Sequence, residues 1–194
     1  PDQVGKYVIY EVDSFVLGEP GPEDTLYKMQ IKEVVASIYN DNQNRPTMRI
    51  ERYKKFYDPL IPYSAMNWVL KDVWSANRTA STAEKVEEGV RFIKLVFPAS
   101  DNSTWNGNAQ NSWEPCGYPY EAWDYEITSA HGSQTINGFT FDSVVTVRQN
   151  NVNNFVDTKY GLEKYAKNVG MVYKEIILLK KSPENISDNP PYGD

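Results

Sequence analysis

The chain has 194 residues and a formal net charge of −6, and its aromatic residues comprise 14 Tyr, 7 Phe and 5 Trp. Nucleic-acid binding needs Lys and Arg to displace counterions from phosphates, so this acidic charge argues against a nucleic-acid partner. The single cysteine, Cys116, excludes an intrachain disulfide. No segment approaches the roughly 20 apolar residues of a transmembrane helix, and the aromatic excess favours β-sheet.

The first part of the chain predicts two strands. Residues 5–17 form an apolar-rich run that ends in the Gly- and Pro-rich turn cluster 18–22. In residues 27–39 apolar and polar side chains alternate, but the alternation changes phase in the middle of the run. Because side chains in a strand alternate with period two, this change predicts a β-bulge near Glu33.

The next predicted strands follow a polar hairpin loop at residues 41–44. They cover residues 47–56, 66–75 and 90–97. Residues 81–89 fit two structures. The spacing of their Ser and Glu fits the capping box of a short helix, whereas their final Glu-Gly pair fits a hairpin turn.

Residues 98–123 are rich in Asn, Ser, Gly and Pro and show no period. A stretch of this length without regular structure is often functional. Strands are predicted again at residues 124–128 and 139–149, and an Asn-Gly hairpin signal precedes the second of them. A final hairpin is predicted to join residues 160–166 to residues 171–179.

These elements predict an all-β, mainly antiparallel fold: a single curved sheet, lipocalin-like or a half-open barrel, with a long aromatic-rich loop. Strand–helix alternation of the βαβ type is absent from the pattern. One domain is expected over residues 1–181. The remaining residues, 182–194, contain three Pro and no Lys or Arg, which predicts a disordered tail.

Three segments together resemble a family of uncharacterised cell-envelope lipoproteins of Bacteroidetes. They are residues 104–109 (TWNGNA), 139–147 (FTFDSVVTV) and 165–175 (YAKNVGMVYKE), and the likeness extends to residues 73–79 and 91–98. The resemblance implies export and an antiparallel β architecture. It also implies a lipid anchor upstream of residue 1 and a place in the periplasm or on the outer-membrane surface.

The predicted ligand-binding residues lie in the aperiodic loop, where aromatic and amide side chains are interleaved. Aromatic faces stack on sugar rings, and pockets combine an apolar lining with a few placed polar groups. The predicted set is Trp105, Asn106, Asn108, Trp113, Tyr118, Tyr120 and Trp123. The alternative interpretation is that the tryptophans fasten the loop to the core of the domain.

Other chemistries have weaker support in the sequence. A glycoside hydrolase needs two carboxylates, which Glu114, Glu121, Asp124 and Glu126 would have to supply. The one histidine, His131, lies in a turn without a nucleophile-elbow pattern, and the surroundings of Cys116 contain no basic residue to activate a thiol. Calcium ligands are present at Asp101, Asn102, Asn106 and Asn108, although without an EF-hand pattern.

The sequence therefore predicts a non-enzymatic envelope domain without a cofactor or resident metal. It would bind an apolar or glycan ligand or serve as an accessory or structural surface protein. A carbohydrate-active enzyme is the alternative. Contact with a membrane is expected only through the lipid anchor, and the oligomeric state is not predicted.

Overall fold

The computed structural model describes residues 3–17, 24–111 and 124–180. In these residues the regular structure is β-strand apart from one 3-10 turn, and the paired strands are antiparallel, so the predicted fold class is confirmed. The chain divides into two compact units, residues 1–94 and 95–194. The single domain expected over residues 1–181 stays a prediction, and the expected tail lies outside the described residues.

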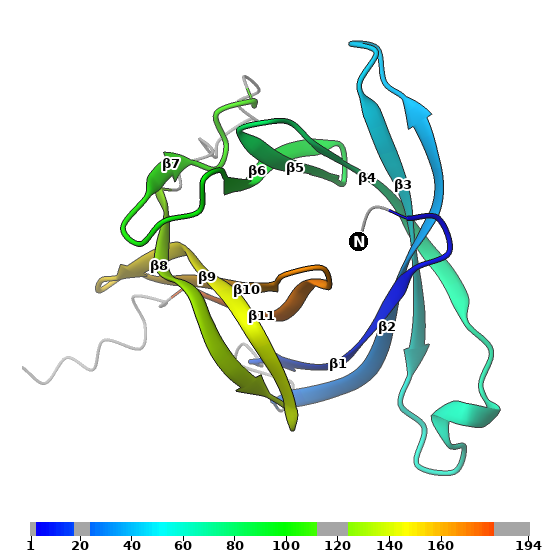
Figure 1. Ribbon diagram of the computed structural model, residues 1–194. Coiled ribbons are helices and arrows are strands. Elements are labelled where there is room, and N and C mark those ends of the chain that lie inside the picture. The colour runs from blue at the N-terminus through cyan, green and yellow to red at the C-terminus, as the bar shows by residue number, and fades with distance from the viewer. Residues whose placement is uncertain (1–2, 18–23, 112–123, 181–194) are drawn as a thin grey trace, which may run out of the picture. The chain divides into compact units, whose positions relative to one another are not determined.

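The first six strands form one sheet in the order β1-β2-β3-β4-β5-β6. Their bounds are Tyr7–Val16 (β1), Thr25–Asn40 (β2), Pro46–Phe56 (β3), Val69–Arg78 (β4), Thr82–Glu87 (β5) and Val90–Val96 (β6). Each strand lies beside its neighbour in sequence, so no crossover is needed. Figure 1 shows that this sheet is a strongly curled half-barrel, which turns from β1 and β2 through β3 and β4 to β5 and β6.

Two β-bulges interrupt the ladders of this sheet. A register shift between Val35 and Ser37 leaves Ala36 as the extra residue of β2 against β3. The bulge expected near Glu33 is therefore present, three residues further along the strand. A second shift leaves Lys71 of β4 without a direct partner in β3. Bulges bend the strand that carries them, so both favour the curl.

The turns confirm two predicted hairpins. Glu88 and Gly89 have φ values of 49° and 81°, and Asn137 and Gly138 have φ values of 48° and 81°. A two-residue turn with positive φ at both positions is the type I′ turn, whose twist matches that of the flanking strands. For residues 81–89 the hairpin is therefore right, and the helix is wrong.

The remaining strands form a second sheet in the order β11-β10-β9-β8-β7, so the described strands divide into two sheets where a single curved sheet was expected. Their bounds are Thr104–Asn106 (β7), Asp124–Ile136 (β8), Phe139–Asn153 (β9), Asp157–Ala166 (β10) and Gly170–Lys180 (β11). The predicted final hairpin is confirmed as β10–β11. The strand predicted at residues 124–128 is longer than expected, because β8 continues to Ile136.

The core of the second unit lies on β8 and β9. Tyr125, Ile127 and Val147 are almost completely buried and pack together. Partly buried side chains surround them: Leu95, Val96, Ala99, Trp105, Ala130, Val145 and Tyr165. One of these partly buried side chains, Trp105, belongs to the predicted ligand-binding set. Its packing against the core bears on the role of residues 104–109.

Candidate ligand-binding site

Three of the seven predicted ligand residues lie in the described part of the chain. Trp105 and Asn106 belong to β7, and Asn108 follows that strand. The other four lie outside the described residues: Trp113, Tyr118, Tyr120 and Trp123. A binding rim formed by the whole set stays a prediction.

Internal packing explains the described part of the TWNGNA segment. The Trp105 ring meets the Tyr125 ring edge to face, with centroids 5.6 Å apart and planes at 67°. A Cβ on Gly107 would lie 2.4 Å from the Tyr125 ring, so only glycine fits there. The Asn106 side chain accepts a hydrogen bond from the backbone N–H of Asn108 at 2.9 Å, which holds the turn. These contacts favour the interpretation that Trp105 fastens the segment to the core.

Two of the four candidate catalytic carboxylates can be placed. Asp124 is exposed at the start of β8, and Glu126 forms an ion pair with Arg148 of β9. Glu114 and Glu121 lie outside the described residues. No separation between two facing carboxylates is defined, so the glycoside-hydrolase pair stays a prediction.

The single histidine is fixed by a backbone group. His131 has a φ of 64° and lies within β8. Its Nε2 lies 2.9 Å from the carbonyl oxygen of Ala99, which can only accept, so Nε2 carries a proton and donates it. Its Nδ1 lies 3.5 Å from the hydroxyl of Ser143. That distance exceeds the about 2.6–3.2 Å expected between a catalytic base and a serine nucleophile. Cys116 lies outside the described residues.

Two of the four side chains proposed as calcium ligands, Asp101 and Asn106, accept hydrogen bonds from the backbone. Asp101 accepts a hydrogen bond from the backbone N–H of Ala130 at 2.6 Å, and Asn106 accepts from Asn108. Within residues 3–17, 24–111 and 124–180, no three His, Cys, Asp or Glu side chains gather as a metal site would require. The Asp and Asn oxygens serve the loop geometry here.

An ion network crosses one face of the half-barrel. Glu33 of β2 pairs with Arg52 of β3 at 3.0 Å and with Lys85 of β5 at 3.1 Å. Arg52 also pairs with Asp72 of β4 at 2.9 Å. Arg52 and Lys85 both lie over the ring of Trp74, at 3.6 Å and 4.6 Å from its centroid. The cations of this face therefore have anionic and aromatic partners within the sheet.

The same network identifies the concave face. In a flat sheet β2 and β5 would lie about 14 Å apart, three strand spacings. The Glu33 carboxylate nevertheless reaches the Lys85 ammonium on β5. Only a curl towards these side chains brings them together, so Glu33, Arg52 and Lys85 lie on the inner face.

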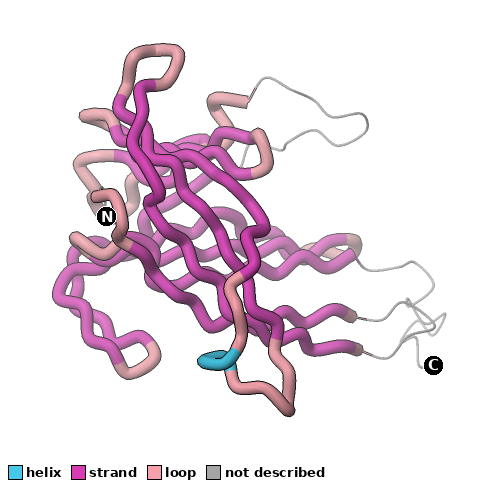
Figure 2. Tube along the Cα trace, turned by 90° about the vertical axis from the view of Figure 1, so that its right-hand side faces the viewer, coloured by secondary structure: helices cyan, strands magenta, loops and turns pink. Residues whose placement is uncertain are grey.

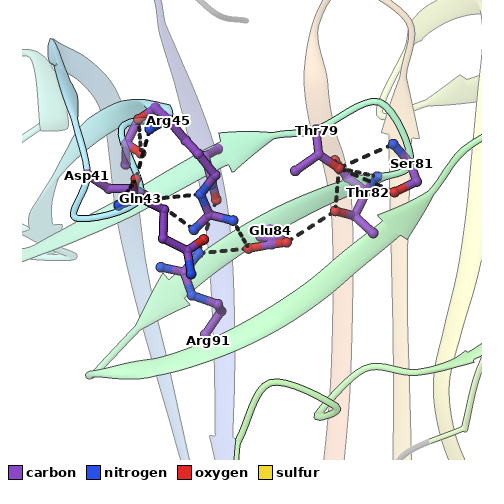
Figure 3. Close-up of polar contacts among 10 residues, drawn as sticks. Asp41, Gln43, Arg45, Thr79, Ser81, Thr82, Glu84 and Arg91 are labelled. Atoms are coloured by element: carbon purple, nitrogen blue, oxygen red, sulfur yellow. Dashed lines mark hydrogen bonds and ion pairs between the residues drawn. The ribbon is translucent and has the colours of Figure 1, made fainter.

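A second polar cluster joins the tips of two hairpins, as Figure 3 shows. The buried Glu84 carboxylate accepts hydrogen bonds from Arg91 at 2.7 Å and from the Thr82 hydroxyl at 3.2 Å. Arg45, from the β2–β3 hairpin, lies 3.6 Å from the same carboxylate and 2.8 Å from Asp41. The hydrogen bonds from Arg45 lower the pKa of Asp41 from 3.8 to about 2. The charges of this cluster are paired with one another, which indicates a structural role.

The connection between β3 and β4 contains a hollow of a different kind. Residues 57–63 line an open hollow of about 390 Å³ at the surface, where Tyr57 is 56% exposed and Leu60 is 89% exposed. The rings of Tyr57 and Tyr63 meet at 66° with centroids 6.3 Å apart. Pro59, Ile61 and other apolar side chains complete the wall, and Asp58 supplies a carboxylate. We name this site the tyrosine–proline hollow.

Several contacts hold the hollow in shape. The Asp58 carboxylate accepts a hydrogen bond from the backbone N–H of Leu60 at 2.8 Å. The largely buried Lys55 donates to the carbonyl of Tyr63 at 2.6 Å, and its ammonium lies 4.4 Å from the Trp68 ring centroid. A 3-10 turn, Tyr63–Ala65, closes the segment and is the cyan element of Figure 2. The hollow is therefore formed before any ligand binds.

Sequence reasoning missed this site. The two prolines of the segment Tyr-Asp-Pro-Leu-Ile-Pro-Tyr at residues 57–63 indicated only a break between strands. The available signal was a segment that begins and ends with a tyrosine and contains two prolines. An exposed loop has little other reason to carry four aromatic or aliphatic residues among seven.

Comparisons with protein-family models, curated proteins and solved structures found no match to this chain. Among the described residues there is no helix with the length and apolar character needed to cross a bilayer.

Proposed function

We propose that this chain is a non-enzymatic domain of an exported cell-envelope lipoprotein and that it binds an apolar or glycan ligand. The envelope location is supported by the likeness of residues 104–109, 139–147 and 165–175 to lipoproteins of Bacteroidetes. The ligand-binding role is supported by the tyrosine–proline hollow. The anchor would precede residue 1, on the periplasmic or outer surface.

The hollow is the observation that carries the proposal. It combines a concave wall of two tyrosine rings and aliphatic side chains with a single carboxylate, and binding sites for small molecules share this composition. Tyrosine offers a flat apolar face together with a hydroxyl, so it suits both a hydrocarbon chain and the C–H face of a sugar. The other candidate clusters are charge-paired internally, which makes the hollow the better site.

Calorimetry with a small panel tests the proposal: glucose, N-acetylglucosamine and a medium-chain fatty alcohol. We expect at least one probe to bind and Tyr57→Ala to weaken its binding about tenfold, the effect of losing about 1.4 kcal/mol of contact. Tyr57 is more than half exposed, so the substitution should leave the fold intact.

Tyr39→Ala is the matched control, because Tyr39 is similarly exposed on the same sheet and does not line the hollow. It should bind the probe as the unmodified chain does. If a probe binds equally well to the Tyr57 variant, the hollow is not the site. If no probe binds, the ligand-binding role fails, and an accessory or structural surface role takes its place.

A further inference from the structure

The walls of the tyrosine–proline hollow offer few hydrogen-bond donors. Pro59 and Pro62 have no backbone N–H. The N–H of Leu60 donates to the Asp58 carboxylate, and the N–H of Ile61 donates to the Asp58 carbonyl at 3.3 Å. These backbone donors are therefore absent or already used, the two tyrosine hydroxyls can both donate and accept, and the carboxylate of Asp58 has further lone pairs. Such a lining favours a ligand that donates hydrogen bonds or carries positive charge.

The electrostatic surroundings point the same way. Burial raises the pKa of the Tyr63 phenol, and the neighbouring Glu11, Tyr57 and Asp13 raise it further. Two carboxylates of β1 thus make the potential at this ring negative. The nearby ammonium of Lys55 is engaged by the Tyr63 carbonyl and the Trp68 ring.

The geometry of the rings completes the argument. Aromatic faces carry negative partial charge, and cations bind within about 6 Å of a ring centroid. The Tyr57 and Tyr63 rings meet edge to face, with planes at 66° and centroids 6.3 Å apart, so a cation over the face of one ring also lies near the other ring. Groups of aromatic rings bind quaternary ammonium ligands.

We propose that the tyrosine–proline hollow binds an organic ammonium group, a protonated amine or quaternary nitrogen on an apolar or sugar-ring body. This inference rests on the proposed function and narrows its ligand class. The ammonium lies over the face of one of the two tyrosine rings and near the other, and the Asp58 carboxylate neutralises it. Anionic ligands are excluded, because the acidic neighbours repel them.

Two compounds of the same shape test whether the charge matters: choline, and its uncharged analogue in which carbon replaces the quaternary nitrogen. We expect choline to bind the full chain about tenfold more tightly than the analogue. For the same reason, we expect glucosamine, which carries an ammonium group, to bind more tightly than glucose. Both preferences should shrink as salt is added, since the hollow is open to solvent and screening is effective there.

Asp58→Asn is the decisive variant. Asparagine keeps the oxygen that accepts from Leu60 N–H, so the loop keeps its shape while the charge is lost. The variant should bind choline about as weakly as the unmodified chain binds the neutral analogue. Asp142→Asn, at an exposed position on β9, is the control and should leave the preference unchanged.

These experiments distinguish failure of ammonium recognition from failure of the proposed ligand-binding function. If the neutral analogue binds as tightly as choline, or if Asp58→Asn keeps the preference, recognition of an ammonium is wrong. In that case the proposed function stands as long as binding still depends on Tyr57. If neither compound binds, recognition of an ammonium fails, and the panel of neutral probes decides the broader role separately.

Discussion

The close approach of Gly107 to the Tyr125 ring makes Gly107→Ala a quantitative test of the packing around β7. An added Cβ would lie 2.4 Å from two ring atoms and 2.7 Å from a third. Unstrained contacts between carbon atoms are about 3.5–4.0 Å, so the ring or the backbone has to move by about 1 Å. The ring has little space for this, because Tyr125 is only 1% exposed and contacts Trp105 on one side.

The expected cost follows from that displacement. Overpacking a core costs about 1–3 kcal/mol, and a shift of this size belongs near the upper limit. Alanine also restricts the unfolded chain, which offsets about 0.4–1 kcal/mol. We therefore expect Gly107→Ala to lower the free energy of unfolding by about 2 kcal/mol, by the same balance of overpacking and chain entropy.

Urea denaturation followed by circular dichroism measures this loss, with Gly132→Ala as the matched control. The nearest atom to a Cβ on Gly132 is the Ser129 hydroxyl oxygen at 3.9 Å, an ordinary contact. The control should therefore be neutral or slightly stabilising. In addition, Gly107→Ala should cost less in a Tyr125→Leu background, because the smaller side chain leaves room and the two effects are then not additive. Equal stabilities of the Gly107 and Gly132 variants would refute the packing argument.

Two further predictions concern the charged clusters of the half-barrel. Glu33→Gln leaves Lys85 and Arg52, both largely buried, without their shared carboxylate. We expect the free energy of unfolding to fall by about 2 kcal/mol. A loss below about 0.5 kcal/mol, which is typical of an exposed ion pair, would contradict a buried network. Because Arg45 lowers the pKa of Asp41 to about 2, this pair stabilises the fold above pH 3.8 and loses its contribution as the pH falls towards 2. Carboxyl NMR should find that pKa and a partial rise towards 3.8 in Arg45→Met, because the backbone N–H groups of residues 43 and 45 still donate to the carboxylate. An Asp41 that titrates near 3.8 in the unmodified chain shows that the pair is not formed.

Much of the strand pattern is predictable because local chemistry determines it. The two hairpin turns need residues at positive φ, and Asn137, Gly138 and Gly89 are of the types that tolerate it. The bulge of β2 is visible as a change of phase, but its position is not. The partner strand decides which residue is left unpaired, and this turned out to be Ala36.

The division of the strands into two sheets has no local signal. Alternation tells which side chains share a face, but not which strands pair. The second half of β8 escaped prediction for a similar reason. Its Ala130-His131-Gly132 stretch lacks alternation and contains register shifts, so pairing with β9 alone makes it a strand.

The candidate site was harder to predict than the fold. Trp105 has the composition of a binding residue, yet its contacts with Tyr125 decide its role, and Tyr125 is twenty residues away. The tyrosine–proline hollow depends on Lys55, whose hydrogen bond to Tyr63 folds the loop against β3. Neither contact leaves a pattern in the sequence, because both depend on tertiary geometry.

The bridge between Glu33 and Lys85 has a consequence for the order of folding. The backbone ladders of the six-stranded sheet join neighbouring strands and can form by successive closure of short loops, which is fast. The Glu33–Lys85 bridge spans 52 residues and forms only once the strands between them have paired and curved. We therefore expect the bridge to form after the rate-limiting barrier, so that Glu33→Gln accelerates the unfolding of the half-barrel while the rate of folding stays nearly the same.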